Sequence, residues 1–113
     1  LAAANKRIAN ILRKLDQPVG NNWQHERLDE AAEHTLAAQL DAIKPEADAL
    51  FAAKDYTAYL ERLAGLHAAV DDYFDSVMVM CDDLDLRNNR LALLTDVSQL
   101  FTRIADVALL TEQ

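Results

Sequence analysis

The part of the chain that follows Asp83 contains no glycine and no proline, and this absence constrains the fold more than any other feature of the sequence. Asp82, Asp83 and Asp85 form an acidic cluster at its start. Carboxylates at the start of a helix accept hydrogen bonds from unpaired main-chain N–H groups and complement the positive end of the helix dipole. The sequence therefore predicts one long helix that begins near Asp83 and continues to near Leu110.

The apolar residues of this helix should share one broad arc that faces the core, because successive residues are turned by about 100°. They are Leu86, Leu93, Leu94, Val97, Leu100, Phe101, Ile104, Ala105, Val107 and Ala108. The opposite side should be solvated. Its residues are Asn88, Thr95, Asp96, Gln99, Arg103 and Asp106.

Arg90 projects into the middle of the apolar arc, and Arg87 lies at its edge. An arginine is rarely buried unless it is paired. Two interpretations are open. Arg90 forms a structural ion pair with an acid of the preceding turn, Asp71, Asp72 or Asp75, or the two arginines reach beyond the core and bind an anion.

Composition favours an all-helical chain. The 113 residues are 51% hydrophobic, with only two glycines and two prolines, and alanine and leucine are good helix formers. A chain of this length can bury one core. We therefore predict an all-α fold, a single bundle of four to six helices closed by the long C-terminal helix. The length fits one domain over residues 1–113. Because the amphipathic pattern begins at once, we expect this domain to be a fragment of a longer protein.

The helices that precede the long one follow from apolar spacing and from turn residues. Residues 1–15 should form the first helix, residues 16–26 a loop, and residues 27–43 the second helix. Pro45 suits the first turn of a new short helix over residues 46–53. Asp55 can cap a third helix that runs through Gly65 to Val70 and carries six residues inward: Tyr56, Tyr59, Leu60, Leu63, Leu66 and Val70. Gly65 is either tolerated or allows another helix to approach.

Four segments carry a family resemblance: AAANKRIANIL at the start, and VDDYFDSV, VMVMCDDLDLRNNRLALL and LFTRIADVALL in the second half. In this order they resemble the DALR-type anticodon-binding domain that ends the beta subunit of bacterial glycyl-tRNA synthetase. At the place of the four-letter DALR motif this chain has Leu84-Asp85-Leu86-Arg87, which keeps only the leucine and the arginine of the motif. The stretch from Asp16 to Lys54 contributes little to the resemblance.

The resemblance implies a noncatalytic domain that contacts the anticodon stem-loop of tRNA(Gly), since aminoacylation in the family resides in the alpha subunit. It implies no cofactor in this domain, with ATP and magnesium used elsewhere in the parent ligase. The expected partners are tRNA(Gly), the rest of the beta subunit and the alpha subunit, in the cytoplasm. No membrane partner is expected, because no apolar run approaches the roughly 18 to 20 residues that span a bilayer. The single cysteine, Cys81, excludes an internal disulfide and fits a reducing compartment.

A basic face on the predicted first helix is the clearest functional signal in the residues themselves. Lys6, Arg7, Arg13 and Lys14 share it with Asn10, opposite the apolar face, and they are four of the 11 basic residues in a chain of net charge −8. The alternative is a face that is merely solvated. Combined with the segments that match the family, this face predicts a tRNA-binding surface. Its residues are Asn5, Lys6, Arg7, Asn10, Arg13, Lys14, Arg87, Asn89 and Arg90.

Two further features have alternative interpretations. Trp23, in the predicted loop, either plugs the edge of the core or stacks on a base. The acidic balance counts against unspecific binding to nucleic acid. It is natural for a second class of protein, a noncatalytic helical protein-interaction or regulatory module.

Catalytic and metal-binding patterns are absent from the sequence. His25, His34 and His67 are far apart, and there is no glycine-rich phosphate loop. Glu30 and Glu33 stand at the wrong spacing from His34 for a metal-binding pair, so we assign them to a solvated face. The aspartates near residue 83 are better explained as helix caps than as a metal site. We predict no catalytic residue and no metal site.

Overall fold

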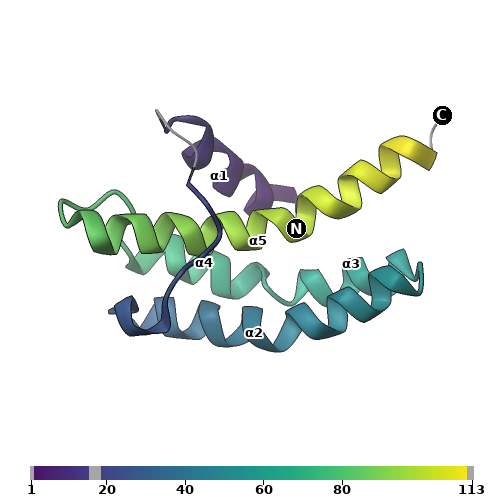
Figure 1. Cartoon of the computed structure of the whole chain (residues 1–113), viewed down its shortest axis with the longest axis horizontal. Coiled ribbons are helices and arrows are strands. Elements are labelled where there is room, and N and C mark those ends of the chain that lie inside the picture. Colours follow the sequence, from purple (N-terminus) through teal and green to yellow (C-terminus); the bar gives the residue numbers. More distant parts are fainter. Residues whose placement is uncertain (1, 16–18, 112–113) are drawn as a thin grey trace.

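A computed structural model describes the main chain of residues 2–15 and 19–111 and the side chains of residues 4–15 and 19–105. Within these residues the chain is helical, with α1 (Ala2–Arg13), α2 (Ala31–Ala52), α3 (Tyr56–Ala64), α4 (His67–Ser76) and α5 (Leu84–Thr111), and a short 3-10 helix, η1 (His25–Arg27) (Figure 1). The prediction of an all-α fold of four to six helices with a long last helix is confirmed.

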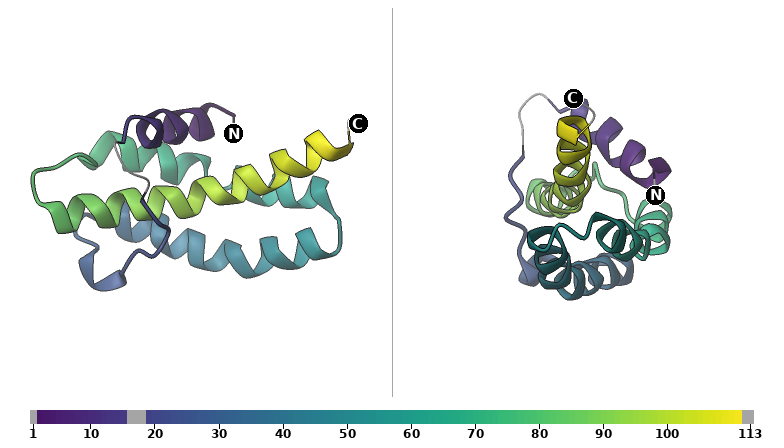
Figure 2. Two further views of the ribbon diagram at one scale, coloured as in Figure 1. Left: turned by 45° about the horizontal axis from the view of Figure 1, so that its top comes forward. Right: turned by 90° about the vertical axis from the view of Figure 1, so that its right-hand side faces the viewer.

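The long helix α5 lies in the middle of the bundle. On one side it contacts α2 and α3, and on another it contacts α1, which also touches α4 (Figure 2). The segment from residue 19 to η1 crosses α5 to reach α2 on the far side (Figure 1). Other helices cover α5 on two sides, and residues 91 to 94 are all buried. Four successive residues point to all sides of a helix, so the buried surface of α5 is wider than the single apolar arc that was predicted.

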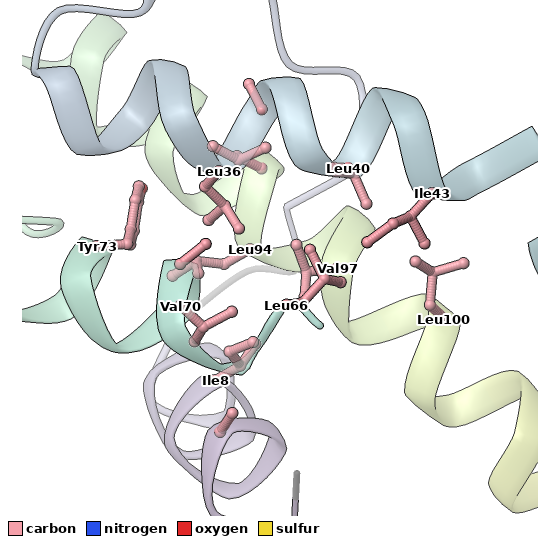
Figure 3. Close-up of a cluster of buried hydrophobic side chains, with 14 of the residues drawn as sticks. Ile8, Leu36, Leu40, Ile43, Leu66, Val70, Tyr73, Leu94, Val97 and Leu100 are labelled. Atoms are coloured by element: carbon pink, nitrogen blue, oxygen red, sulfur yellow. The ribbon is translucent and has the colours of Figure 1, made fainter. Parts of the chain in front are cut away.

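The core forms where α2, α4, α5 and α1 meet (Figure 3). Its labelled side chains are Ile8, Leu36, Leu40, Ile43, Leu66, Val70, Tyr73, Leu94, Val97 and Leu100, all buried. Two buried tyrosines fasten neighbouring helices to α5: the Tyr59 hydroxyl donates to the carbonyl of Leu100 at 2.6 Å, and the Tyr73 hydroxyl to that of Arg90 at 3.1 Å. Burial, with the charge of Glu33 second, raises the pKa of Tyr73 above its ordinary value.

The apolar arc predicted for α5 is confirmed for the residues in its middle, with Leu93, Leu94, Val97, Leu100 and Phe101 buried. Asp106, Val107 and Ala108 lie outside the residues whose side chains are described. Asp83 caps the helix, because its Oδ1 accepts from the main-chain N–H groups of Asp85 at 3.0 Å and Leu86 at 3.2 Å. The predicted start near Asp83 is therefore confirmed.

The helix boundaries around Pro45 were predicted wrongly. α2 begins at Ala31, after the η1 turn, and continues through Pro45 to Ala52. A proline inside a helix removes one hydrogen bond and crowds the carbonyl four residues before it. Here both Pro45 and Asp41 are exposed, so the carbonyl that loses its partner can be hydrated, while burial of Ile43 and Ala47 on the opposite side keeps the helix continuous.

The helix predicted to run through Gly65 is divided there into α3 and α4. Its predicted cap is confirmed, since Asp55 Oδ1 accepts from the N–H of Ala58 at 3.2 Å. A Cβ atom at Gly65 would lie 3.3 Å from the carbonyl oxygen of Arg62, so glycine relieves a close approach at the end of α3. Leu66 is fully buried immediately after the break, which anchors the turn into α4.

Arg90 is paired, but with a partner that the sequence did not suggest. Its Nε and Nη2 donate to the two carboxylate oxygens of Glu33 at 3.0 and 3.3 Å, and its Nη1 donates to the carbonyl of Met78 at 2.8 Å. Glu33 is 0% exposed and Arg90 5% exposed, so Glu33 is not on a solvated face and Asp71, Asp72 and Asp75 are not the partners. Burial alone lowers the pKa of Arg90, but the hydrogen bond and the charge of Glu33 raise it overall.

Trp23 closes the edge of the core, which confirms that interpretation of the loop tryptophan. It packs against the core, and its Nε1 donates to Oδ2 of Asp96 at 2.9 Å. Lys44 Nζ lies 3.1 and 3.0 Å from the two oxygens of the same carboxylate. Asp96 was predicted to be solvated, yet it is buried because these two partners satisfy it.

We expect Arg90→Met to lower the free energy of unfolding by about 3 to 5 kcal/mol, because it leaves the buried Glu33 carboxylate without its partner. Urea unfolding followed by circular dichroism measures this change. A matched control is Arg62→Met, which breaks the exposed Arg62–Glu46 pair and should cost less than about 1 kcal/mol. Equal, small effects of the two substitutions would contradict a structural role for Arg90.

We expect Asp96→Ala to lower the free energy of unfolding by about 1 to 3 kcal/mol, because the Trp23 N–H loses its acceptor in a partly buried site. The chain contains one tryptophan, so acrylamide quenching of its fluorescence reports directly on this loop. Quenching should increase in Asp96→Ala and stay unchanged in Asp75→Ala, which removes an exposed carboxylate. Quenching equal to that of the wild-type protein would show that Asp96 does not hold the loop.

Candidate nucleic-acid interface

The helix α1 is held to the bundle by one face. Ala4 and Ile8 are buried against α4 and α5, and Ile11 and Leu12 pack partly buried beside them. α1 contains no acidic residue. The opposite face of α1 points to solvent (Figure 2), and the charged residues of this helix are all basic.

Lys6 and Arg13 are exposed on this outward face, and Asn10 lies between them, half-buried. Lys14 is exposed in the turn that directly follows α1. Arg13 Nη2 donates to Oδ1 of Asn10 at 2.8 Å, which orients both side chains. None of the three basic residues forms a salt bridge to another residue whose side chain is described. We call Lys6, Asn10, Arg13 and Lys14 the α1 basic face.

Most of the other basic residues are neutralised within the fold. Salt bridges engage Arg7, Arg27, Lys44, Arg62, Arg90 and Arg103. Among the described side chains, the α1 basic face is thus a local concentration of positive charge without acidic partners, in a chain of net charge −8.

Arg7 was predicted to belong to the RNA-facing surface, but it turns towards α4. Its Nη1 lies 3.4 Å from Oδ1 of Asp71, and its guanidinium carbon lies 4.5 Å from the centre of the Phe74 ring. These contacts secure α1 to α4. Asn5 is half-buried and lies on a different side of α1 from the basic face.

Asn89 and Arg90 are structural in this conformation. Asn89 is buried; its Oδ1 accepts from the N–H of Gln24 at 2.6 Å, and its Nδ2 donates to the carbonyl of Gln24 at 3.1 Å. Arg90 is bound to Glu33. Neither side chain lies on the accessible surface, so contact of either one with RNA would require these hydrogen bonds to break.

Arg87 remains partly exposed on the first turns of α5. The end of α1 meets α5 two turns further along, where Leu12 and Leu15 border a shallow cavity with Thr95 and Val19. The structure therefore brings Lys6, Asn10 and Arg13 together on one face of α1, with Lys14 in the turn that follows. It shows no contact between these residues and Arg87.

A polar pocket was not predicted from the sequence. It has a volume of about 240 Å³ and lies between the loop that follows residue 19 and the first turns of α5, lined in part by Asn22, Gln24, Arg27 and Asn88. The signal that could have revealed it is the amide-rich run from Asn21 to Gln24 together with Asn88 and Asn89.

Among the described residues, no three histidine, cysteine, aspartate or glutamate side chains lie close enough to hold a metal ion. Within the same part of the chain, no helix combines the length and the apolar character needed to cross a membrane.

Comparison with known proteins connects this chain to a family. The family profile described as DALR anticodon binding domain matches residues 1–108. The chain is 54% identical to the "Glycine--tRNA ligase beta subunit" of Acinetobacter baumannii, 54% identical to that of Acinetobacter baylyi and 48% identical to that of Shewanella putrefaciens. Each match covers 97% of this chain and 16% of the relative, so the chain spans about one sixth of the length of these relatives. The family profile covers nearly all of the helical bundle, and the chain belongs to the DALR anticodon-binding domain family.

Proposed function

We propose that this chain binds the anticodon stem-loop of tRNA(Gly) as the noncatalytic anticodon-binding domain of a glycine–tRNA ligase beta subunit. The observation that carries the proposal is the α1 basic face, three exposed cations without acidic partners among the described residues, in a chain that belongs to an anticodon-binding family. Membership of the family indicates the type of ligand, and the α1 basic face provides a surface that suits a phosphate backbone.

The charge distribution favours binding at one location. Lysine and arginine neutralise phosphates and release counterions, which provides affinity without sequence preference. A net charge of −8 repels nucleic acid from the rest of the surface. A strand should therefore be directed to α1 rather than bind throughout the molecule.

Different residues should contribute in different ways. Lys6, Arg13 and Lys14 suit phosphates, and Arg87 can add a further contact near the start of α5. Asn10, a short amide fixed by Arg13, suits a base edge or a ribose. Phosphate contacts set affinity and orientation, whereas base contacts set discrimination.

The wider assignment is also a proposal. The rest of the beta subunit and the alpha subunit would be the protein partners, in the cytoplasm, with ATP and magnesium used elsewhere in the ligase. The relatives that support it are named glycine–tRNA ligase beta subunits.

One observation favours a second function, a protein-interaction module. Met78 is 73% exposed and Met80 and Leu84 are also exposed, so the turn between α4 and α5 presents apolar side chains to solvent. Exposed apolar patches often mark contacts with other proteins. This surface is separate from α1, so tRNA binding and docking to another domain are compatible.

We expect the double substitution Lys6→Ala and Arg13→Ala to weaken tRNA binding and to reduce the salt dependence. Each lost phosphate contact should lower the slope of log affinity against log salt by about 0.7, or about 1.4 for both. Fluorescence anisotropy with tRNA(Gly) from low to moderate salt measures the slope. Circular dichroism verifies the helices.

The matched control is Lys54→Ala with Arg62→Ala, which removes the same number of positive charges, but near the ends of α2 and α3. Affinity and slope should stay close to those of the wild-type protein. If both double variants weaken binding equally, only net charge matters. If neither does, the α1 basic face is merely solvated and the interaction module becomes the better assignment.

In the complete ligase, the α1 substitutions should impair charging through tRNA binding and not through the chemical step. We expect the KM for tRNA(Gly) to rise about tenfold, with kcat nearly unchanged, since contacts made equally in ground and transition states affect KM alone. Steady-state aminoacylation at limiting and saturating tRNA separates the two quantities. Unchanged charging at limiting tRNA would refute the proposed role.

A further inference from the structure

The polar pocket beside α5 has a size that suits one small planar group. Its volume of about 240 Å³ lies below the roughly 300 to 1,000 Å³ of pockets that hold drug-sized ligands. It opens between the segment that follows residue 19 and the first turns of α5. Its position therefore admits a group that projects from a longer ligand lying across the surface.

The pocket is formed before any ligand arrives. Asn89, buried on α5, holds the main chain of Gln24 through two hydrogen bonds of 2.6 and 3.1 Å. Trp23, the preceding residue, is fixed by Asp96. Two adjacent loop residues, Trp23 and Gln24, are therefore hydrogen-bonded to α5. Little conformational entropy of the loop remains to be lost when a ligand binds.

The walls carry polar groups with free hydrogen-bonding capacity. The side chains of Asn22 and Asn88 are exposed and form no hydrogen bond to another described residue. Each amide offers one acceptor oxygen and two N–H donors, a combination that matches the mixed donor and acceptor edge of a nucleobase. Arg27 is held by Gln24 Oε1 at 3.0 Å and by Asp85 at 3.1 Å. Its planar guanidinium can stack on an unpaired base.

The local charge favours a base over a phosphate. Asp85 neutralises Arg27, and Asp82 and Asp83 lie just before it in the sequence. These carboxylates would repel a phosphate or a free anion. An uncharged base with donors and acceptors is compatible with such a rim.

We infer that this pocket receives one unpaired nucleobase of the bound RNA and that the amides of Asn22 and Asn88 read its edge. The inference rests on the proposed function. Val19 lines both this pocket and the shallow cavity beside Leu12 and Leu15, so the pocket adjoins the C-terminal end of α1. Arg13 and Lys14 stand at the same end of α1, so a strand that contacts them can extend towards the pocket.

The test compares two double variants of this chain, Asn22→Ala with Asn88→Ala and Asn21→Ala with Gln99→Ala. The control pair also takes one amide from the loop and one from α5, but these two side chains bond to each other at 2.6 Å and do not line the pocket. The probes are the tRNA(Gly) anticodon stem-loop and versions with each unpaired loop base replaced in turn. Affinities are measured at two salt concentrations, with circular dichroism to verify folding.

The wild-type chain should prefer the native loop over at least one replaced loop by about tenfold, within the range of a good bidentate amide contact to a base. The pocket variant should lose that preference and keep the salt slope, whereas the control variant should keep both. A pocket variant that retains every base preference overturns the inference. So does a wild-type chain that binds all loops equally, and in either case RNA binding through α1 stands. If the wild-type chain binds no probe, the proposed function fails, and this inference with it.

Discussion

The buried ion pair between Glu33 and Arg90 is the interaction on which the arrangement of the other helices depends. Glu33 lies in the first turn of α2, where its carboxylate also accepts from the main-chain N–H groups of Asp29 at 3.1 Å and Glu30 at 2.6 Å. Arg90 binds that carboxylate and the carbonyl of Met78. One pair therefore fixes the start of α2, the turn after α4 and the register of α5. Two buried charges are costly unless they satisfy each other and their remaining hydrogen-bonding groups, and this geometry meets both conditions.

At the start of α5, neighbouring residues have different roles: some hold the fold together and others are available for the proposed recognition of RNA. Asn89 and Arg90 point into the fold, whereas Arg87 and Asn88 remain accessible. A helix turns by about 100° per residue, so neighbours in the sequence can face opposite environments. The inward pair holds the loop and α2, and the proposed RNA contacts are built on the outward pair. Recognition residues on a rigid helix are positioned more accurately than residues on a free loop.

The distribution of charge suits a domain that binds nucleic acid at one location. Among the described residues, acidic side chains pair with six of the basic ones, including Arg7 and Arg27, which lie close to the proposed site. The α1 basic face has no such partner among the described residues. Affinity would come from α1 and discrimination from the amides beside α5, which separates a salt-dependent contribution from a salt-insensitive one.

The sequence by itself determined the features that depend on neighbours along the chain: the helical composition, the start of α5 at the acidic cluster, the cap at Asp55, and the basic face of α1 opposite its apolar face. Each follows from helix periodicity and from local hydrogen bonds. Tertiary structure decided the rest. The choice of Glu33 for Arg90 joins residues 57 positions apart, and the burial of Asp96 requires Trp23 and Lys44 from distant segments. Asn89 turned inward because Gln24 lies beside it, and α2 continued through Pro45 because burial on its other side stabilised the helix. These outcomes depend on which surfaces meet in space, and periodicity along a single chain does not contain that information.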